Sequence, residues 1–199
     1  MKAIILISEA SLPLAKTLQR ELPDTLIYTK NECEGCISIT SCHRFIEEHF
    51  NDFDSIIFIG AMGICVRSIA GCIKNKYKDP AVVCVDSTGR FVISVLSGHV
   101  GGANELTRHI AAITGGEAVI TTQSDNAGLW ALDTLAGKYG WKITVPHAKM
   151  NRLVTLFVNR EPTALLLDIK DKGTEYLERT LPAHVKAVSY THLTLPTKA

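Results

Sequence analysis

A glycine-rich loop between an apolar run and an amphipathic segment constrains the fold of this chain more than any other feature. The apolar run covers residues 91–96, the loop reads Ser-Gly-His-Val-Gly-Gly over residues 97–102, and apolar residues then recur at helical spacing over residues 106–113. We predict a strand, a glycine loop and a helix that has Asn104 as its N-cap, followed by a short strand over residues 118–121. Such a unit is typical of α/β proteins.

The loop over residues 97–102 offers chemistry mainly through its backbone. Glycines let a ligand approach closely, and the first N–H groups of a helix bind carboxylates and phosphates. His99 is the only side chain in the loop that exchanges a proton near neutral pH, which makes it the candidate for acid/base catalysis. A hydrogen bond from His99 to a neighbouring loop is the alternative, since the loop matches neither a GxGxxG pattern nor a P-loop.

A second unit of the same kind precedes this one. Residues 55–59 have the pattern of a buried strand, Gly60 and Gly63 mark the turn that follows, and a helical pattern comes next. Arg67 lies about one turn into this helix, and its planar guanidinium is suited to bidentate pairing with a ligand carboxylate. An ion pair with a carboxylate of the protein itself is the alternative.

The remaining patterns place these units in one sheet. Residues 2–28 have the pattern of a strand, a helix and a second strand, whereas residues 81–85 and 91–96 form two strands of a β-hairpin with Gly89 in its turn. We therefore predict an α/β fold over residues 1–125, with a mostly parallel sheet of βα units and an internal β-hairpin.

The expected sheet predicts where a ligand binds. Open α/β sheets bind ligands beyond the carboxyl ends of their strands. The loops that begin at Gly60, Ser97 and Thr121 all follow predicted strands, so we expect them to converge on one site.

A small α/β middle region follows over residues 126–187. It has neither a glycine-rich loop nor an acid/base cluster, so we assign it packing or substrate covering. Its patterns predict, in order, a helix over 129–139, a strand over 141–145, a helix over 148–158, a strand over 163–168 and a short helix over 175–181.

The last segment, residues 188–199, has neither the periodicity nor the charge of the chain before it. It is typical of a translated sequencing-library adapter, so we expect these residues to be foreign to the native protein. A genuine disordered terminus is the alternative.

Composition excludes several classes of protein. The formal net charge of +1 argues against a nucleic-acid partner, although a modest basic cluster lies within residues 67–90 and suits an anionic ligand. The chain has no apolar run of transmembrane length, and residues 3–7 are too short for a signal peptide, so we expect a cytoplasmic protein without membrane contact.

The six cysteines are expected to be reduced thiols, as is usual in a chain of this size and location. Cys33 and Cys36 form a Cys-x-x-Cys pair, and Cys42-His43 follows, which is an incomplete zinc pattern. A thiol-based zinc or redox protein stays an alternative function, and it requires Cys33, Cys36 and Cys42 to converge.

Four motifs in order resemble a known family. They are Gly-Ala-Met-Gly-Ile-Cys-Val-Arg over residues 60–67, Lys-Asp-Pro-Ala-Val-Val over 78–83, Leu-Ser-Gly-His-Val-Gly-Gly-Ala-Asn-Glu-Leu over 96–106, and Val-Ile-Thr-Thr over 119–122 with Asp125. Together they resemble the N-terminal domain of the cobalt-precorrin-5A hydrolase (CbiG) family. The resemblance continues as the middle region of that family, whereas its usual C-terminal domain is expected to be absent.

The resemblance implies a hydrolase of anaerobic cobalamin biosynthesis. Such an enzyme opens the ring A δ-lactone of the cobalt corrinoid cobalt-precorrin-5A and releases acetaldehyde to give cobalt-precorrin-5B. The corrinoid is the expected small-molecule partner, and because it carries its own cobalt, we expect no cofactor and no metal held by the protein. A homo-oligomer stays open.

Lactone opening needs a base and oxyanion donors. We expect His99 as the base, Glu105 or Asp125 as the group that orients its imidazole, and backbone N–H groups near Gly101 and Gly102 as the oxyanion donors. The expected substrate-binding residues are Gly60, Gly63, Arg67, Ser97, Gly98, Gly101, Gly102, Asn104, Thr121 and Thr122.

A binding module without chemistry is the main alternative. In that case the same loops hold a corrinoid or a nucleotide, and another domain catalyses the reaction. Asp125 lies near the distance at which a nucleotide-binding unit places its ribose-binding acid, but the spacing of the glycines disagrees with that motif. A corrinoid carboxylate is therefore the better candidate ligand.

Overall fold

The computed structural model describes residues 1–188 and divides into two compact units, of which the first is Met1–Thr122. The elements of the first unit are β1 (Lys2–Leu6), η1 (Glu9–Ser11), α1 (Leu12–Glu21), β2 (Thr25–Thr29), β3 (Ile37–Ser38), α2 (Cys42–His49), η2 (Phe50–Asp52), β4 (Ser55–Ile59), α3 (Met62–Ile69), β5 (Ala81–Val85), β6 (Phe91–Leu96), α4 (Ala103–Thr114) and β7 (Glu117–Val119). The predicted α/β class is confirmed.

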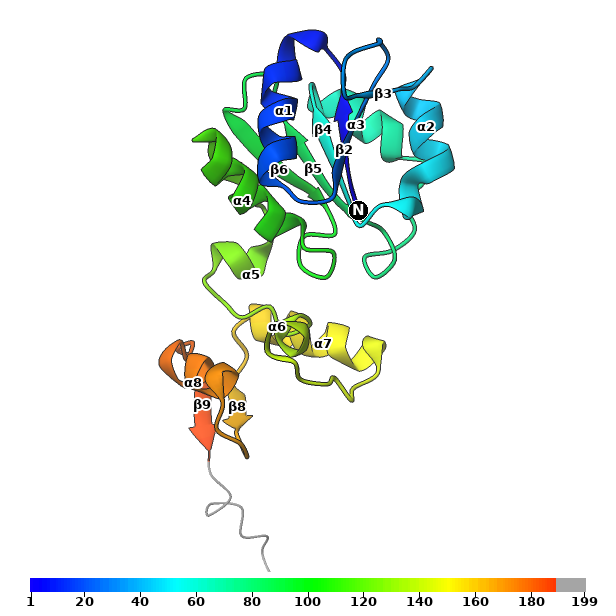
Figure 1. Cartoon of the computed structure of the whole chain (residues 1–199). Coiled ribbons are helices and arrows are strands. Elements are labelled where there is room, and N and C mark those ends of the chain that lie inside the picture. The colour runs from blue at the N-terminus through cyan, green and yellow to red at the C-terminus, as the bar shows by residue number, and fades with distance from the viewer. Residues whose placement is uncertain (189–199) are drawn as a thin grey trace, which may run out of the picture. The chain divides into compact units, whose positions relative to one another are not determined.

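The first unit contains a seven-stranded sheet in the order β3-β2-β1-β4-β5-β6-β7 (Figure 1). The first five strands in this order, β3, β2, β1, β4 and β5, are mutually parallel. β6 is antiparallel to β5, and β7 is parallel to β6. The last two strands therefore run opposite to the other five.

Helices cover both faces of the sheet, which explains why its central strands are continuous apolar runs. In β1, Ile4 and Leu6 belong to a core shared with α1 and α4, whereas Ala3 and Ile5 belong to a core shared with α2 and α3. Figure 1 shows α1 and α4 on one side of the sheet and α2 and α3 on the other. All five residues of β5 are buried, as a strand between two helix layers requires.

The reversal between β5 and β6 depends on Asp86. Its carboxylate accepts hydrogen bonds from the Phe91 N–H at 2.6 Å, the Thr88 N–H at 3.0 Å and the Thr88 hydroxyl at 2.5 Å. Gly89 takes a φ of 77° in the same turn, where side chains are strained. Burial raises the pKa of Asp86, but the hydrogen bonds outweigh it and hold that pKa below its ordinary value.

The reversal places the loop at Ser97 at the opposite end of the sheet from the loop at Gly60. Leu96 pairs with Val82 near the start of β5, whereas the Gly60 N–H donates to Val85 at its end. The predicted convergence of the loops at Gly60, Ser97 and Thr121 is therefore wrong. The rule on carboxyl ends applies within a parallel set, and β6 and β7 leave that set; Thr121 lies at the same end as Ser97 because β7 is parallel to β6.

The second unit begins at Gln123. Its described elements are α5 (Gln123–Asn126), α6 (Leu135–Tyr139), α7 (His147–Val158), β8 (Thr163–Leu166), α8 (Lys172–Arg179) and β9 (Val185–Val188). β8 and β9 are parallel, and a core around Trp130, Phe157 and Leu177 holds the unit together.

The strand predicted over residues 141–145 is absent from the structure, which has no regular element there. The Trp141 indole instead donates to Asp171 at 2.8 Å, and Asp171 caps α8 through the N–H groups of Gly173 and Thr174. The predicted helix over residues 129–139 is reduced to the single turn and a half of α6. Except for Val188, the expected foreign tail lies outside the described residues. No helix within residues 1–188 is long and apolar enough to cross a membrane.

We predict that Asp86→Asn lowers the free energy of unfolding at pH 7 by about 1 to 2 kcal/mol, because charge-assisted hydrogen bonds are replaced by weaker ones. The depressed pKa means that the carboxylate stabilises the fold above the pKa of the unfolded chain, about pH 4, and that this contribution is lost as the pH falls through the lower pKa of the folded state. The difference between the variant and the parent chain should therefore shrink in acid. Urea denaturation at pH 7 and pH 3 measures both values.

Glu32→Gln is the matched control, because Glu32 is an exposed carboxylate without a hydrogen-bond or ion-pair partner among residues 1–188. Its unfolding free energy should match that of the parent chain. A pH-independent difference for Asp86→Asn would contradict a role for the ionised carboxylate in the turn.

Candidate functional site

The glycine loop is anchored to the start of β5. Ser97 has a positive φ of 57°, and its buried hydroxyl donates to the carbonyl of Asp79 at 2.9 Å. The Asp79 carboxylate is itself buried and accepts the Lys74 N–H through both oxygens at 3.0 Å. The loop is therefore held in a fixed position by the segment that leads into β5.

The N-cap of α4 is Gly102, with a φ of 84°, so the predicted N-cap at Asn104 is wrong. Asn104 lies in the first turn instead and is 2% exposed. Its Oδ1 accepts the Ser94 hydroxyl at 2.7 Å and its Nδ2 donates to Thr122 Oγ1 at 3.0 Å. The buried amide thus ties α4 to β6 and to the segment after β7, which favours a positioning role for Asn104 over direct contact with a ligand.

Packing explains two of the loop glycines. A Cβ at Gly98 would lie 2.8 Å from Asn104 Oδ1, and a Cβ at Gly101 would lie 2.5 Å from the Ser97 Cβ. Both are closer than van der Waals contact. The loop therefore needs these glycines to close on Asn104 and Ser97, whatever it binds.

His99 and Gly101 retain the chemistry expected of the loop. His99 is half-buried, and its carbonyl accepts the Gly102 N–H at 3.1 Å. The Gly102 N–H is thus already engaged, whereas no acceptor for the Gly101 N–H is found among residues 1–188. Of the Gly101 and Gly102 N–H groups that were predicted to stabilise an oxyanion, only that of Gly101 is therefore available.

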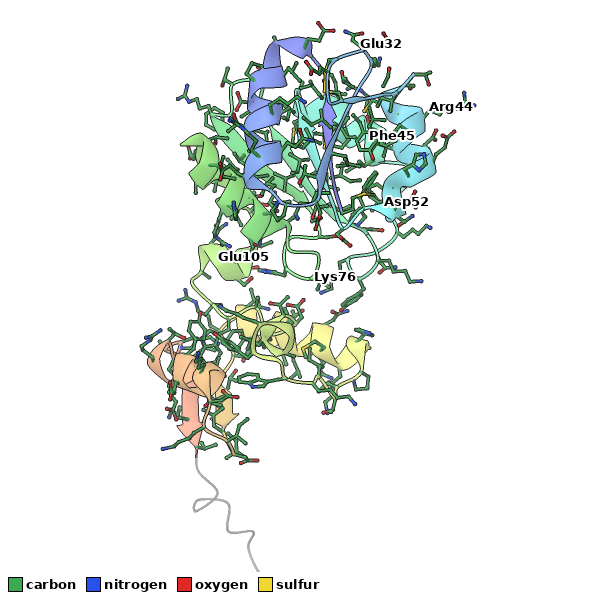
Figure 2. The ribbon with its side chains drawn as sticks, viewed as in Figure 1. Glu32, Arg44, Phe45, Asp52, Lys76 and Glu105 are labelled. Atoms are coloured by element: carbon green, nitrogen blue, oxygen red, sulfur yellow. A yellow bond between two sulfur atoms is a disulfide. The ribbon has the colours of Figure 1, made fainter. Side chains whose placement is uncertain are left out.

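The two carboxylates expected to orient His99 have different surroundings. The Glu105 side chain is 84% exposed and pairs with Arg108 at 2.8 Å, one turn further along α4. Asp125 belongs to α5 in the second unit, so its role at His99 stays a prediction. In Figure 2, Glu105 and Lys76 lie towards one end of the sheet and Glu32 towards the other.

An open cavity of about 600 Å³ lies beside the first turns of α4. Its lining residues are Lys2, Leu22, Pro23, Ser55, Glu105, Leu106, Arg108 and His109. His99 and the loop glycines do not line it, so it does not complete a site around the predicted base.

Arg67 lies in a different pocket, between α2 and α3, with a volume of about 530 Å³. The lining residues are Lys30, Ser41, Cys42, His43, Ile64, Arg67 and Ser68. Arg67 makes no ion pair with another residue in the range 1–188, contrary to the alternative of an internal ion pair. Sequence reasoning missed Lys30 and Ser41, and it considered His43 only as part of an incomplete zinc pattern. The available signal was that these residues follow β2 and β3 at the same edge of the sheet as Gly60.

The cysteines do not form a metal cluster. Cys33 and Cys36 are joined in a disulfide, with Cα atoms 5.5 Å apart, so the expectation of reduced thiols is wrong for this pair. The turn closed by the Cys36 N–H on the Cys33 carbonyl brings them together. Cys42 is buried on α2, where burial raises the pKa of its thiol. No three His, Cys, Asp or Glu side chains in the described part of the chain gather as a metal site.

Comparisons with known proteins agree with the resemblance in the motifs. Residues 44–125 match the family described as cobalamin synthesis G N-terminal, and residues 130–193 match the cobalamin biosynthesis central region. A cobalt-precorrin-5A hydrolase from Salmonella typhimurium is 36% identical over 168 residues, which cover 83% of this chain and 48% of that protein. One from Priestia megaterium is 33% identical over 195 residues, with coverage of 94% and 52%.

A solved structure shows the same fold. It is a cobalamin biosynthesis protein G homologue from Sulfolobus solfataricus, with a TM-score of 0.51 and 21% identity, and the match covers 94% of this chain and 54% of that one. The chain spans about half the length of the curated relatives it matches.

The fold and the glycine loops define an open, mostly parallel α/β domain that is followed by a smaller α/β unit. With both family regions matched in order, the chain belongs to the CbiG family and carries its N-terminal and central regions.

We predict that Asn104→Ala lowers the free energy of unfolding by about 2 kcal/mol, because it leaves the buried hydroxyl partners of the amide without their hydrogen bonds. Urea denaturation measures this value. His109→Ala, an exposed residue of the same helix, should leave stability unchanged. An Asn104→Ala variant as stable as the parent chain would show that the amide does not hold the loop.

Proposed function

We propose that this chain forms the N-terminal and central regions of a cobalt-precorrin-5A hydrolase. The observation that carries the proposal is identity of 36% and 33%, over most of the chain, to two relatives of that name. The proposed reaction opens the ring A δ-lactone of cobalt-precorrin-5A and releases acetaldehyde, leaving cobalt-precorrin-5B.

The loop over residues 97–102 is the proposed place of catalysis. His99 accepts a proton from water as the water attacks the lactone carbonyl, and the Gly101 N–H donates to the oxyanion that forms. Collapse of this intermediate breaks the carbon–oxygen bond and leaves a carboxylate and an alcohol. Breakage of the carbon–carbon bond to the macrocycle then leaves the electron pair on the macrocycle, transfers the hydroxyl proton to a base and releases the fragment as acetaldehyde.

The substrate brings its own cobalt in this scheme, so neither a protein-held metal nor a cofactor is required. Ser97 and Asn104 would act by holding the loop, and Thr121 and Thr122 lie at the same end of the sheet. Asp125 is the proposed orienting carboxylate, because Glu105 already pairs with Arg108.

A corrinoid-binding role without chemistry is the second candidate. One observation favours it: Glu105, one of the two carboxylates expected to orient His99, is 84% exposed and pairs with Arg108. In that case the part of the relatives that this chain does not span would supply the catalytic groups.

We predict that the purified chain releases acetaldehyde when incubated with cobalt-precorrin-5A. Trapping the aldehyde and quantifying the adduct measures the release, with a full-length relative as positive control. Because the chain contains His99 and the loop, it should show turnover. No release beside an active control would instead support the binding module.

For the active chain, we expect His99→Ala to remove at least about 99% of turnover, as loss of a general base typically costs 10²-fold or more. Substrate binding should be nearly unchanged. His109→Ala is the matched control, because it removes an exposed histidine from the adjoining helix. Full turnover by His99→Ala would rule out His99 as the base.

A further inference from the structure

We propose that the pocket between α2 and α3 is a separate oxyanion-binding site that takes a carboxylate or phosphate group. This inference goes beyond the proposed hydrolase, since none of the residues 97–102 lines this pocket.

The charge of the pocket is the first support. Lys30 and Arg67 both line it, and neither makes a hydrogen bond or ion pair with another residue in the described part of the chain. His43 lines it as well, and its Nε2 lies 3.6 Å from Glu47 Oε1, one turn further along α2. The lining contains no carboxylate, so two cations face the cavity without a protein anion to neutralise them.

The backbone of α2 adds donors to this charge. Ser41, Cys42 and His43 line the pocket, and they form the N-terminal end of the helix. The N–H groups of Cys42 and His43 have no acceptor within residues 1–188, and α2 has no acidic residue in its first turn. Free N–H groups at a helix start favour an anion, and here they lie beside Lys30 and Arg67.

The orientation of Arg67 fits a site at this edge of the sheet. An ideal Cβ at Gly63 would lie 3.4 Å from Arg67 Nη1, so the guanidinium extends back along α3 towards its first turn. That turn follows Gly60 at the carboxyl end of β4, and Lys30 follows the carboxyl end of β2. Ligands of open α/β sheets bind at this edge.

The size and the donor set define the ligand class. A cavity of about 530 Å³ falls within the range of small-molecule pockets. The planar fork of Arg67 pairs with two oxygens of a carboxylate or phosphate, and Lys30 supplies a point charge. A neutral ligand would leave both cations without a counter-charge.

Binding of inorganic phosphate and of citrate to the full chain, measured separately by calorimetry and by amide NMR shifts, tests the proposal. We expect saturable binding of at least one of the two, with shifts of the His43 and Gly63 amides. Tighter citrate binding would identify a carboxylate site, and tighter phosphate binding a phosphate site. Added NaCl should weaken either.

Arg67→Gln and Lys30→Gln should each weaken binding by about tenfold or more, since each removes a charge-assisted contact. Arg44→Gln is the matched control: Arg44 lies on α2, is 75% exposed and pairs with Glu48, and Figure 2 shows it on the outer side of that helix. It should bind as the parent chain does.

Three outcomes would overturn the proposal: no saturable binding of either anion, undiminished affinity in Arg67→Gln and Lys30→Gln, or an equal loss in Arg44→Gln. All three variants change exposed side chains, and equal melting temperatures would confirm that they fold. His99→Ala should retain anion binding, so failure of the hydrolase proposal leaves this test unaffected.

Discussion

The reversal of the chain between β5 and β6 determines which loops of this protein meet. The Asp86 carboxylate closes the turn by accepting hydrogen bonds from Thr88 and Phe91, so β6 returns antiparallel to β5. The loop at Ser97 consequently reaches the start of β5, where the Ser97 hydroxyl donates a hydrogen bond to the Asp79 carbonyl. That position in turn determines where α4 and β7 lie, and it lets Asn104 form hydrogen bonds with both Ser94 and Thr122. A parallel β6 would have placed the loop at Ser97 at the same end of the sheet as Gly60.

Sequence patterns predicted the central strands well because a strand that is buried on both faces consists largely of apolar residues. β5 is a continuous apolar run, and β1 and β4 are apolar after their first residue, as two covering helix layers require. The hairpin was predicted too, and its consequence for the loops was available from the same pattern. The predicted N-cap at Asn104 was wrong because Gly102 adopts a positive φ without strain. The helix therefore begins two residues earlier than an N-cap at Asn104 would allow. The strand predicted over residues 141–145 was wrong because the Trp141 indole donates a hydrogen bond to Asp171, which lies 30 residues further along the chain.

Lys30 and His43 could not be predicted as partners of Arg67. Lys30 directly follows β2 and His43 lies in the first turn of α2, and no local pattern links either residue to Arg67. Only the parallel pairing of β2 with β1 and β3 brings the ends of these strands together, and the packing of α2 on α3 then closes the pocket. Tertiary proximity of this kind leaves no local trace in the sequence.

The separation of the two sites limits what each contributes to a reaction. A five-residue strand spans about 16 Å, and the loop at Ser97 and the end of β4 lie at opposite ends of such strands. A base must lie within hydrogen-bond reach of the proton that it removes. His99 therefore cannot act on an atom held by Arg67 and Lys30. If His99 opens the lactone, the pocket between α2 and α3 holds either a distant carboxylate of the same macrocycle or a different anion, and its occupant is not the group that reacts.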